Sequence, residues 1–241
     1  MFEYPLSEPK RQRYVVIGIS DCHEQYFPPE VQTLIQAKRV FSGGVRHREI
    51  MLPYLPQGAE WIDITIPLKD VFSCYRAYDD IVIFASGDPL FFGFANTVRR
   101  ECPDAEIRLY PSFNSLQMLA HRLLLPYHDM RVVSLTGRPW TRFDQALIEG
   151  EAMIGVLTDR EKTPSAIARR MLDYGYDNYT MAVGEKLGNQ TEENVGTYAL
   201  SEVLGRTFAF PNNLILCRTS VRPRPFGIPE GEFALLDGRA K

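Results

Sequence analysis

The chain has 241 residues with a formal net charge of -3, and 45% of its residues are hydrophobic. This composition is typical of a soluble globular protein with one large or two smaller domains, and it gives no reason to expect nucleic acid or a membrane as partner. No apolar run approaches the roughly 20 residues of a membrane-spanning helix, and the N-terminus lacks the pattern of a signal peptide. The four cysteines form no CxxC pair, which favours reduced thiols in a cytoplasmic protein without a metal site.

Short apolar runs alternate with helical patterns through the first half of the chain. The runs show no polar alternation, which is typical of strands buried on both faces, and their spacing predicts βαβ units with a largely parallel sheet. The fold class is therefore α/β. We expect strands at 14–19, 39–41, 61–64, 81–85 and 106–110, and helices at 28–37, from 49 to about 55, at 71–78 and at 91–100.

The second half repeats the alternation after a proline-led interruption at 111–114. Thr163 and Pro164 are typical of a helix start, with threonine as the N-cap and proline at the first helical position. We expect helices at 115–124, 141–149 and from 164, and strands at 131–135, 152–157, 179–183, 196–198 and 214–218. The predicted organisation is a lead-in at 1–13, two α/β domains at 14–113 and 114–218, and a proline- and glycine-containing linker or tail at 219–241.

The central stretch is residues 80–93, a buried strand that turns abruptly through Ser86, Gly87, Asp88 and Pro89. Open α/β sheets bind ligands at the carboxyl ends of their strands, so this turn is a candidate ligand loop. Glycine lets the backbone approach a ligand, and Asp88 can accept hydrogen bonds there. The alternative is an ordinary strand-to-helix turn.

Basic residues follow other expected strands. Arg46 and His47 come after a Gly-Gly turn, Arg138 follows the strand ending at 135, and Lys186 lies in a glycine-ended segment, 183–188. Arginine forms bidentate bonds with carboxylates, so these residues are candidates for binding an acidic substrate, although a solvated loop is the alternative at each. His121 lies in an apolar helix pattern and fits a structural role.

Several common site motifs are missing from the sequence. The first loop, 18–23, lacks the G-x-G-x-x-G spacing of a dinucleotide site. No GxxxxGK[ST] loop, G-x-S-x-G elbow or metal-binding histidine spacing occurs.

The motifs together resemble a known family. Residues 85–93 resemble the central signature of the tetrapyrrole (corrin/porphyrin) methylases, which use S-adenosylmethionine. Residues 41–47, 131–138, 157–159 with Thr163 and Pro164, and 184–188 are similar to the C5-methylating branch of the precorrin-6Y C5,15-methyltransferases of cobalamin biosynthesis. The first loop carries less glycine than the family's, and residues 111–115 read Pro-Ser-Phe-Asn-Ser where the family has Pro-Gly-Val-Ser-Ser.

The resemblance implies two α/β domains with S-adenosylmethionine in the cleft between them, a homodimer, and C5-methylation of a precorrin-6Y or cobalt-precorrin-7 type substrate. It places the substrate carboxylates at Arg46, His47, Arg138 and Lys186, and names no catalytic residue. A C15-methylating and decarboxylating domain would be fused behind 226–233 or act as a partner. The cofactor-binding residues that it implies are Ser86, Gly87, Asp88, Phe91, Asn114, Ser115, Thr158, Gly184, Glu185 and Leu187.

Two other functions remain open. One is a methyltransferase of the same fold that acts on another tetrapyrrole carbon or on diphthine. The other is a non-catalytic ligand-binding domain, favoured if the two altered loops have abolished the cofactor site.

Overall fold

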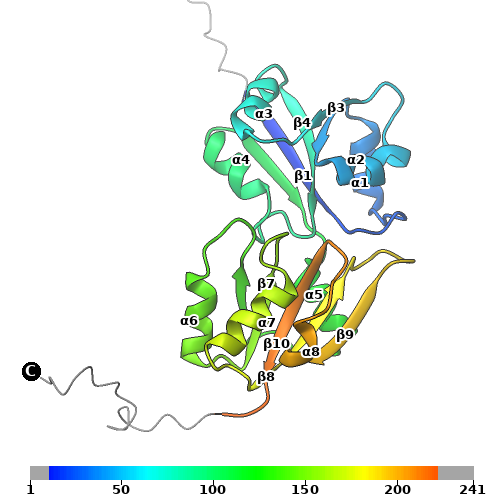
Figure 1. Ribbon diagram of the computed structural model, residues 1–241. Coiled ribbons are helices and arrows are strands. Elements are labelled where there is room, and N and C mark those ends of the chain that lie inside the picture. Colours follow the sequence, from blue (N-terminus) through cyan, green and yellow to red (C-terminus); the bar gives the residue numbers. More distant parts are fainter. Residues whose placement is uncertain (1–10, 222–241) are drawn as a thin grey trace, which may run out of the picture.

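The computed structural model describes residues 11–221. The chain forms two five-stranded sheets, and Figure 1 shows the two halves of the described chain one above the other. The predicted α/β class is confirmed. The tail from 222 and most of the lead-in lie outside the described residues, and the exact domain limits stay predictions.

The first sheet is entirely parallel, as expected, with the strand order β3-β2-β4-β1-β5. Its central strands, β1 and β4, are built from valine, isoleucine, phenylalanine and alanine, which suits burial on both faces. The elements are β1 (Arg13–Ile19), α1 (Pro29–Gln36), β2 (Val40–Gly43), α2 (Val45–Met51), a short 3-10 helix (Leu52–Tyr54), β3 (Glu60–Asp63), α3 (Leu68–Tyr75), β4 (Asp80–Ser86), α4 (Ala95–Glu101) and β5 (Glu106–Tyr110).

Alternate side chains of these strands enter two separate cores. Val15 and Ile17 pack with α1 and α2 on one face of the sheet. Tyr14 and Val16 pack with α3 and α4 on the other face. The first unit therefore has three layers, with helix pairs on opposite sides of the sheet in Figure 1.

The second sheet is mixed, with the order β6-β7-β10-β8-β9. Strands β6 and β7 are parallel, whereas β10 runs antiparallel to both of its neighbours. The short helix α8 had no counterpart in the sequence prediction. The elements are α5 (Ser115–Arg122), β6 (Arg131–Ser134), α6 (Thr141–Glu149), β7 (Met153–Leu157), α7 (Pro164–Asp173), β8 (Tyr179–Glu185), β9 (Asn194–Ala199), α8 (Leu200–Val203) and β10 (Asn212–Arg218).

Helices cover both faces of this sheet as well. Helices α6, α7 and α8 share one core, and α5 packs on the opposite face against β10. Two side-chain caps fix the starts of helices: Asn114 Oδ1 accepts from Gln117 N at 2.9 Å, and Thr163 Oγ1 accepts from Ala166 N at 3.2 Å. The second cap confirms the predicted helix start at Thr163 and Pro164. None of the helices in residues 11–221 is long and apolar enough to cross a bilayer.

Several element limits were predicted wrongly, among them that of α3, which is Leu68–Tyr75 rather than 71–78, and three others bear on the site. Helix α4 begins at Ala95 rather than Phe91, because Phe92 has a left-handed φ of 56° that a right-handed helix cannot include. Helix α2 begins at Val45, so Arg46 and His47 lie in its first turn and not in a loop. Strand β8 continues to Glu185, so Gly184 and Glu185 belong to the strand rather than to the loop after it.

Candidate functional site

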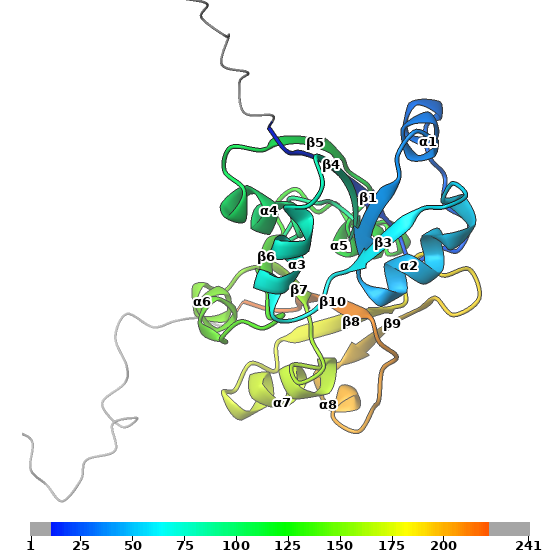
Figure 2. The ribbon, with the colours of Figure 1, turned by 90° about the horizontal axis from the view of Figure 1, so that it is seen from above.

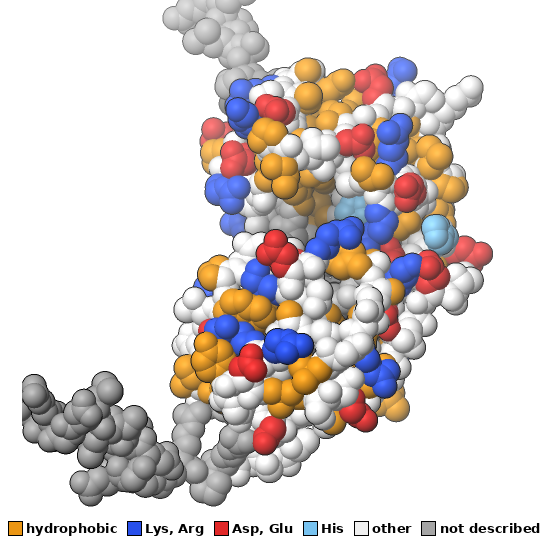
Figure 3. Space-filling model, viewed as in Figure 1, with side chains coloured by type: hydrophobic (Ala, Val, Ile, Leu, Met, Phe, Trp, Pro, Cys, Tyr) orange, Lys and Arg blue, Asp and Glu red, His pale blue; other side chains and the backbone are white. Residues whose placement is uncertain are grey.

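A cavity of about 490 Å³ lies between the ends of the two sheets. In the first unit its walls come from residues just beyond the carboxyl ends of the strands. In the second unit they come from the carboxyl ends of β6, β7 and β8 and from the start of the antiparallel β10. Figure 3 shows this hollow between the units, with basic side chains at its edge. Both sheets therefore direct their ligand-binding edges at the same space.

Glycine allows the loops of the first unit to meet beneath the cavity. A Cβ on Gly18 would lie 1.8 Å from the Gly87 carbonyl oxygen, and one on Gly87 would lie 2.7 Å from Asn114 Cα. Gly87 also has a left-handed φ of 61°. Two backbone hydrogen bonds, from Gly87 N to Ile19 O and from Ser112 N to Gly87 O, join the three segments. The ends of β1, β4 and β5 are thus held in direct backbone contact.

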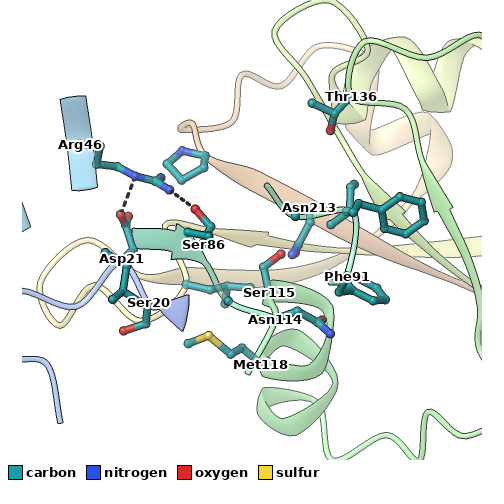
Figure 4. A pocket seen from close by; sticks show the side chains of 18 of the residues that line it. Ser20, Asp21, Arg46, Ser86, Phe91, Asn114, Ser115, Met118, Thr136 and Asn213 are labelled. Atoms are coloured by element: carbon teal, nitrogen blue, oxygen red, sulfur yellow. Dashed lines mark hydrogen bonds and ion pairs between the residues drawn. The ribbon is translucent and has the colours of Figure 1, made fainter. Parts of the chain in front are cut away.

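A polar network covers one wall of the cavity (Figure 4). Arg46 Nε lies 3.3 Å from the Asp21 carboxylate, and Arg46 Nη2 donates to Ser86 Oγ at 3.1 Å. His47 Nε2 lies 2.9 Å from the same hydroxyl oxygen. The network fixes Arg46 and His47, from the first turn of α2, over the turn that follows β4.

His47 is neutral at neutral pH. Its pKa is lowered to about 4, because burial disfavours the charged ring and the adjacent Arg46 repels it, and a hydrogen bond to the Phe84 backbone opposes this only in part. Gly44 N donates to Nδ1 at 3.4 Å, which favours the neutral tautomer with its proton on Nε2, the atom that faces Ser86 Oγ. The positive charge of the predicted Arg-His cluster therefore comes from arginine alone.

The opposite wall belongs to the second unit. Asp159 joins the loop after β6 to the loop after β7. One of its carboxylate oxygens accepts a hydrogen bond from Gly137 N at 3.0 Å. The other accepts from Glu161 N at 2.9 Å and from Lys162 N. Burial raises the pKa of Asp159, but these backbone donors outweigh it and the net pKa is lowered. The neighbouring Thr158 donates to Asn212 Oδ1 at 2.8 Å. These bonds hold the ends of β6, β7 and β10 together.

Arg138 lines the cavity from the second unit. Its Nη1 donates to Ser134 Oγ at 2.8 Å and to the Thr136 carbonyl at 3.1 Å, and its guanidinium lies 5.2 Å from the centre of the Phe92 ring of the other unit. Within the described part of the chain, Arg138 forms no ion pair with a carboxylate. It is therefore a cation with donors available to an acidic ligand.

The structure brings eleven of the fourteen predicted site residues to the cavity. Several come from opposite units, and Figure 4 shows Ser86, Phe91, Asn114 and Ser115 around one space. The residues that line it are Ser86, Gly87, Phe91, Asn114, Ser115, Thr158, Gly184, Leu187, Arg46, His47 and Arg138.

Three predicted residues lie outside the lining. Asp88 Oδ1 accepts from Leu90 N at 2.8 Å, which stabilises the turn after β4. Glu185 is buried and accepts from the Asn194 side chain at 2.6 Å. Lys186 pairs with Glu192. These local partners account for the three side chains, and the structure gives them no contact with the cavity.

Six polar residues at the cavity were missed: Ser20, Asp21, Ser134, Thr136, Asn212 and Asn213. Ser20, Asp21 and Thr136 each follow a strand, so their position after an apolar run was the signal available in the sequence. Asn213 gave no such signal, because the predicted strand began one residue later, at Leu214.

Comparison with known proteins supplies the family. The model of the Tetrapyrrole (Corrin/Porphyrin) Methylases matches residues 15–203. A Precorrin-6Y C(5,15)-methyltransferase [decarboxylating] from Sinorhizobium sp is 32% identical over 193 residues, which cover 79% of this chain and 46% of that protein. The chain thus spans about half the length of this relative. A Cobalt-precorrin-7 C(5)-methyltransferase from Salmonella typhimurium is 26% identical over 179 residues, which cover 73% of this chain and 86% of that protein.

Solved structures share the fold. The uroporphyrin-III C-methyltransferase of Thermus thermophilus, crystallised with S-adenyl homocysteine, superposes with a TM-score of 0.62 at 19% identity, covering 85% of this chain and 92% of that one. The two-sheet architecture, the cavity between the sheets and the match over residues 15–203 agree. The chain therefore belongs to the tetrapyrrole (corrin/porphyrin) methylase family.

Proposed function

We propose that this protein transfers the methyl group of S-adenosylmethionine to C5 of a corrin-precursor tetrapyrrole of the precorrin-6Y or cobalt-precorrin-7 type, in cobalamin biosynthesis. The observation that carries the proposal is the cavity between the two sheets, which has a largely apolar lining and one arginine from each unit. The names of the relatives from Sinorhizobium and Salmonella support the substrate class and the carbon that is methylated.

The cavity fits the cofactor. Its volume of about 490 Å³ lies within the range of roughly 300–1,000 Å³ that is usual for small-molecule sites. Both side-chain amide atoms of Asn213, a buried lining residue, have no hydrogen-bond partner within residues 11–221. A buried polar group without a partner is costly, so a polar ligand at this position would stabilise the site. The residues that would hold the cofactor are Ser86, Gly87, Phe91, Asn114, Ser115, Thr158, Gly184 and Leu187.

Arg46 and Arg138 would bind the acidic side chains of the tetrapyrrole. They belong to different units and face the cavity from opposite walls, so a wide, flat, multiply acidic ligand could contact both. Neutral His47 would contribute through its hydrogen bond to Ser86 rather than through charge. Lys186 stays a prediction from the resemblance, because its ammonium already pairs with Glu192.

The chemistry that the cofactor supplies is an in-line displacement, in which the bond from sulfur to methyl breaks while an electron pair of the ring carbon forms the new bond. The protein would align the two reactants and exclude water. Alignment of this kind can supply roughly 7–11 kcal/mol of the barrier reduction. Apolar lining residues such as Phe91, Met118 and Leu157 would keep the reacting groups dry.

We assign only the C5 step to this chain. Its match covers 86% of the C5 enzyme of Salmonella but 46% of the C5,15 enzyme of Sinorhizobium. The C15-methylating and decarboxylating step would then belong to a fused or separate domain. We further propose a cytoplasmic homodimer, which light scattering of the purified protein would test.

Incubation with methyl-labelled S-adenosylmethionine and late ring-contracted intermediates tests the proposal. We expect label in the tetrapyrrole at C5, and C5 labelling can be read by nuclear magnetic resonance of the product. Label at another ring carbon would indicate a different methylase of this fold. Binding of S-adenosylhomocysteine without any transfer would favour a non-catalytic domain.

A further inference from the structure

Asn213 is a buried polar residue that the predicted site does not include. Its side chain is 2% exposed, and neither Nδ2 nor Oδ1 has a hydrogen-bond partner in the described part of the chain. By contrast, its neighbour Asn212 accepts from Thr158 and donates to the Ala209 carbonyl at 2.9 Å. Asn213 lines the cavity and is labelled among the residues of Figure 4.

The strand register places Asn213 in an apolar floor. It pairs with Leu157 of β7 on one side and with Gly184 of β8 on the other, and all three line the cavity. A Cβ on Gly184 would meet Leu187 and Leu119, which shows that this face of the sheet turns toward α5. Leu187 and Leu119 already cover Gly184, so the surface beside Asn213 is apolar.

The unpaired carboxamide restricts the chemistry of that group. Because Asn213 offers a donor and an acceptor side by side, its ligand should carry an acceptor next to a donor on one edge. Adenine has this arrangement at its 6-amino group and the adjacent ring nitrogen, and asparagine reads adenine in this way in nucleic acids. The charged amino-acid part of the cofactor, in contrast, would need charged partners. Asn213 carries no charge, and the charged lining residues, Asp21, Arg46 and Arg138, come from α2 and from the segments after β1 and β6.

We propose that Asn213 recognises the adenine base of the cofactor through a bidentate hydrogen bond. This inference rests on the proposed function, since it assumes an adenosyl cofactor. It makes Asn213 a specificity-determining residue for the base, while the loops after β1, β2 and β4 hold the remainder of the cofactor and the substrate.

Calorimetric titration tests the proposal with two probes, S-adenosylhomocysteine and its 6-deamino analogue, on wild-type protein and on Asn213→Leu. Wild-type protein should bind the analogue roughly 5- to 100-fold more weakly, because Asn213 Oδ1 loses its donor. Asn213→Leu should bind S-adenosylhomocysteine roughly 5- to 100-fold more weakly than wild type and should no longer distinguish the two probes.

Thermal unfolding separates this role from a structural one. Leucine keeps the branching of asparagine at Cγ and removes two unpaired polar atoms, so ligand-free Asn213→Leu should unfold at the wild-type temperature or above it. Asn178→Leu is the matched control, because Asn178 also has a buried, unpaired Oδ1 but lies outside the cavity lining. This control should leave the affinity for both probes unchanged.

The outcomes are distinct. If wild-type protein does not bind S-adenosylhomocysteine, the proposed function fails and the role of Asn213 fails with it. If wild-type protein binds both probes equally, or if Asn213→Leu keeps the wild-type preference, the adenine contact is wrong while the proposed function stands. The comparison of the two probes on wild-type protein needs no variant, so equal binding refutes the adenine contact even if Asn213→Leu does not fold.

Discussion

Replacing Gly87 with alanine should disrupt the base of the cavity. Gly87 has a φ of 61°, and a left-handed backbone costs an alanine roughly 1–2 kcal/mol. The added Cβ would also lie 2.7 Å from Asn114 Cα and 3.0 Å from the Phe113 carbonyl oxygen. These are backbone atoms that cannot rotate away, and such overpacking costs roughly 1–3 kcal/mol more. We therefore expect Gly87→Ala to lower the free energy of unfolding by about 2–5 kcal/mol.

Gly58→Ala is the matched control for this change. Gly58 has a φ of 76°, but a Cβ there would meet nothing within 4 Å, so only the backbone term of roughly 1–2 kcal/mol applies. Urea unfolding gives both free energies, and calorimetry with S-adenosylhomocysteine gives the effect on binding. Gly87→Ala should weaken binding, since it separates the turn after β4 from Asn114, while Gly58→Ala should not. Equal destabilisation by the two substitutions, with unchanged binding in both, would refute the close approach of these loops.

Three other predictions concern charged and titrating groups. The folded-state pKa of His47, about 4, lies below its usual 6.5, so the unfolded chain binds one more proton between these values. The free energy of unfolding should therefore fall by up to about 1.4 kcal/mol per pH unit as the pH drops from 6.5 to 4. His47→Gln should flatten this slope when it is measured by urea unfolding. An unchanged slope would contradict the lowered pKa of His47. Arg46→Ala should raise the KM for the tetrapyrrole roughly tenfold or more without changing the affinity for S-adenosylhomocysteine. The control is Arg48→Ala, which should change neither value, because Arg48 pairs with Asp63 outside the cavity lining. A normal KM in the Arg46 variant would show that Arg46 does not bind the substrate. Asp159→Asn should lower the free energy of unfolding by about 1–3 kcal/mol, because the amide nitrogen cannot accept hydrogen bonds from the backbone donors of the loops after β6 and β7. An unfolding temperature equal to that of the wild type would show that those bonds contribute little.

Local sequence signals predicted most of the elements because they act within a few residues. Continuous apolar runs located the strands, and the Thr163-Pro164 pair located the start of α7, because burial on both faces and capping are each decided locally. The start of α4 was misplaced because the left-handed Phe92 depends on the turn that packs beneath it, where a Cβ on Gly93 would lie 2.4 Å from the Pro89 carbonyl oxygen. A helical pattern gives no sign of such a turn.

Site residues that directly follow strands could be predicted from the sequence, whereas those whose position depends on the pairing register of the strands could not. Ser86, Asn114 and Thr158 lie just beyond or at the ends of strands, so topology alone brings them to one edge. The positions of Glu185 and Asn213 depend on strand pairing: Glu185 bonds to Asn194 across β8 and β9, and Asn213 lines the cavity where β10 pairs with Gly184 of β8. The antiparallel course of β10, which brings its start to the cavity, could not be inferred from residues 214–218 alone.

The structure of the protein with S-adenosylhomocysteine tests the central claim most directly. The account predicts that the ligand fills the cavity between the two sheets, with its adenine against Asn213 and its sulfur facing the space between Arg46 and Arg138. A ligand bound elsewhere, or a cavity that stays empty at saturating ligand concentration, would contradict the claim.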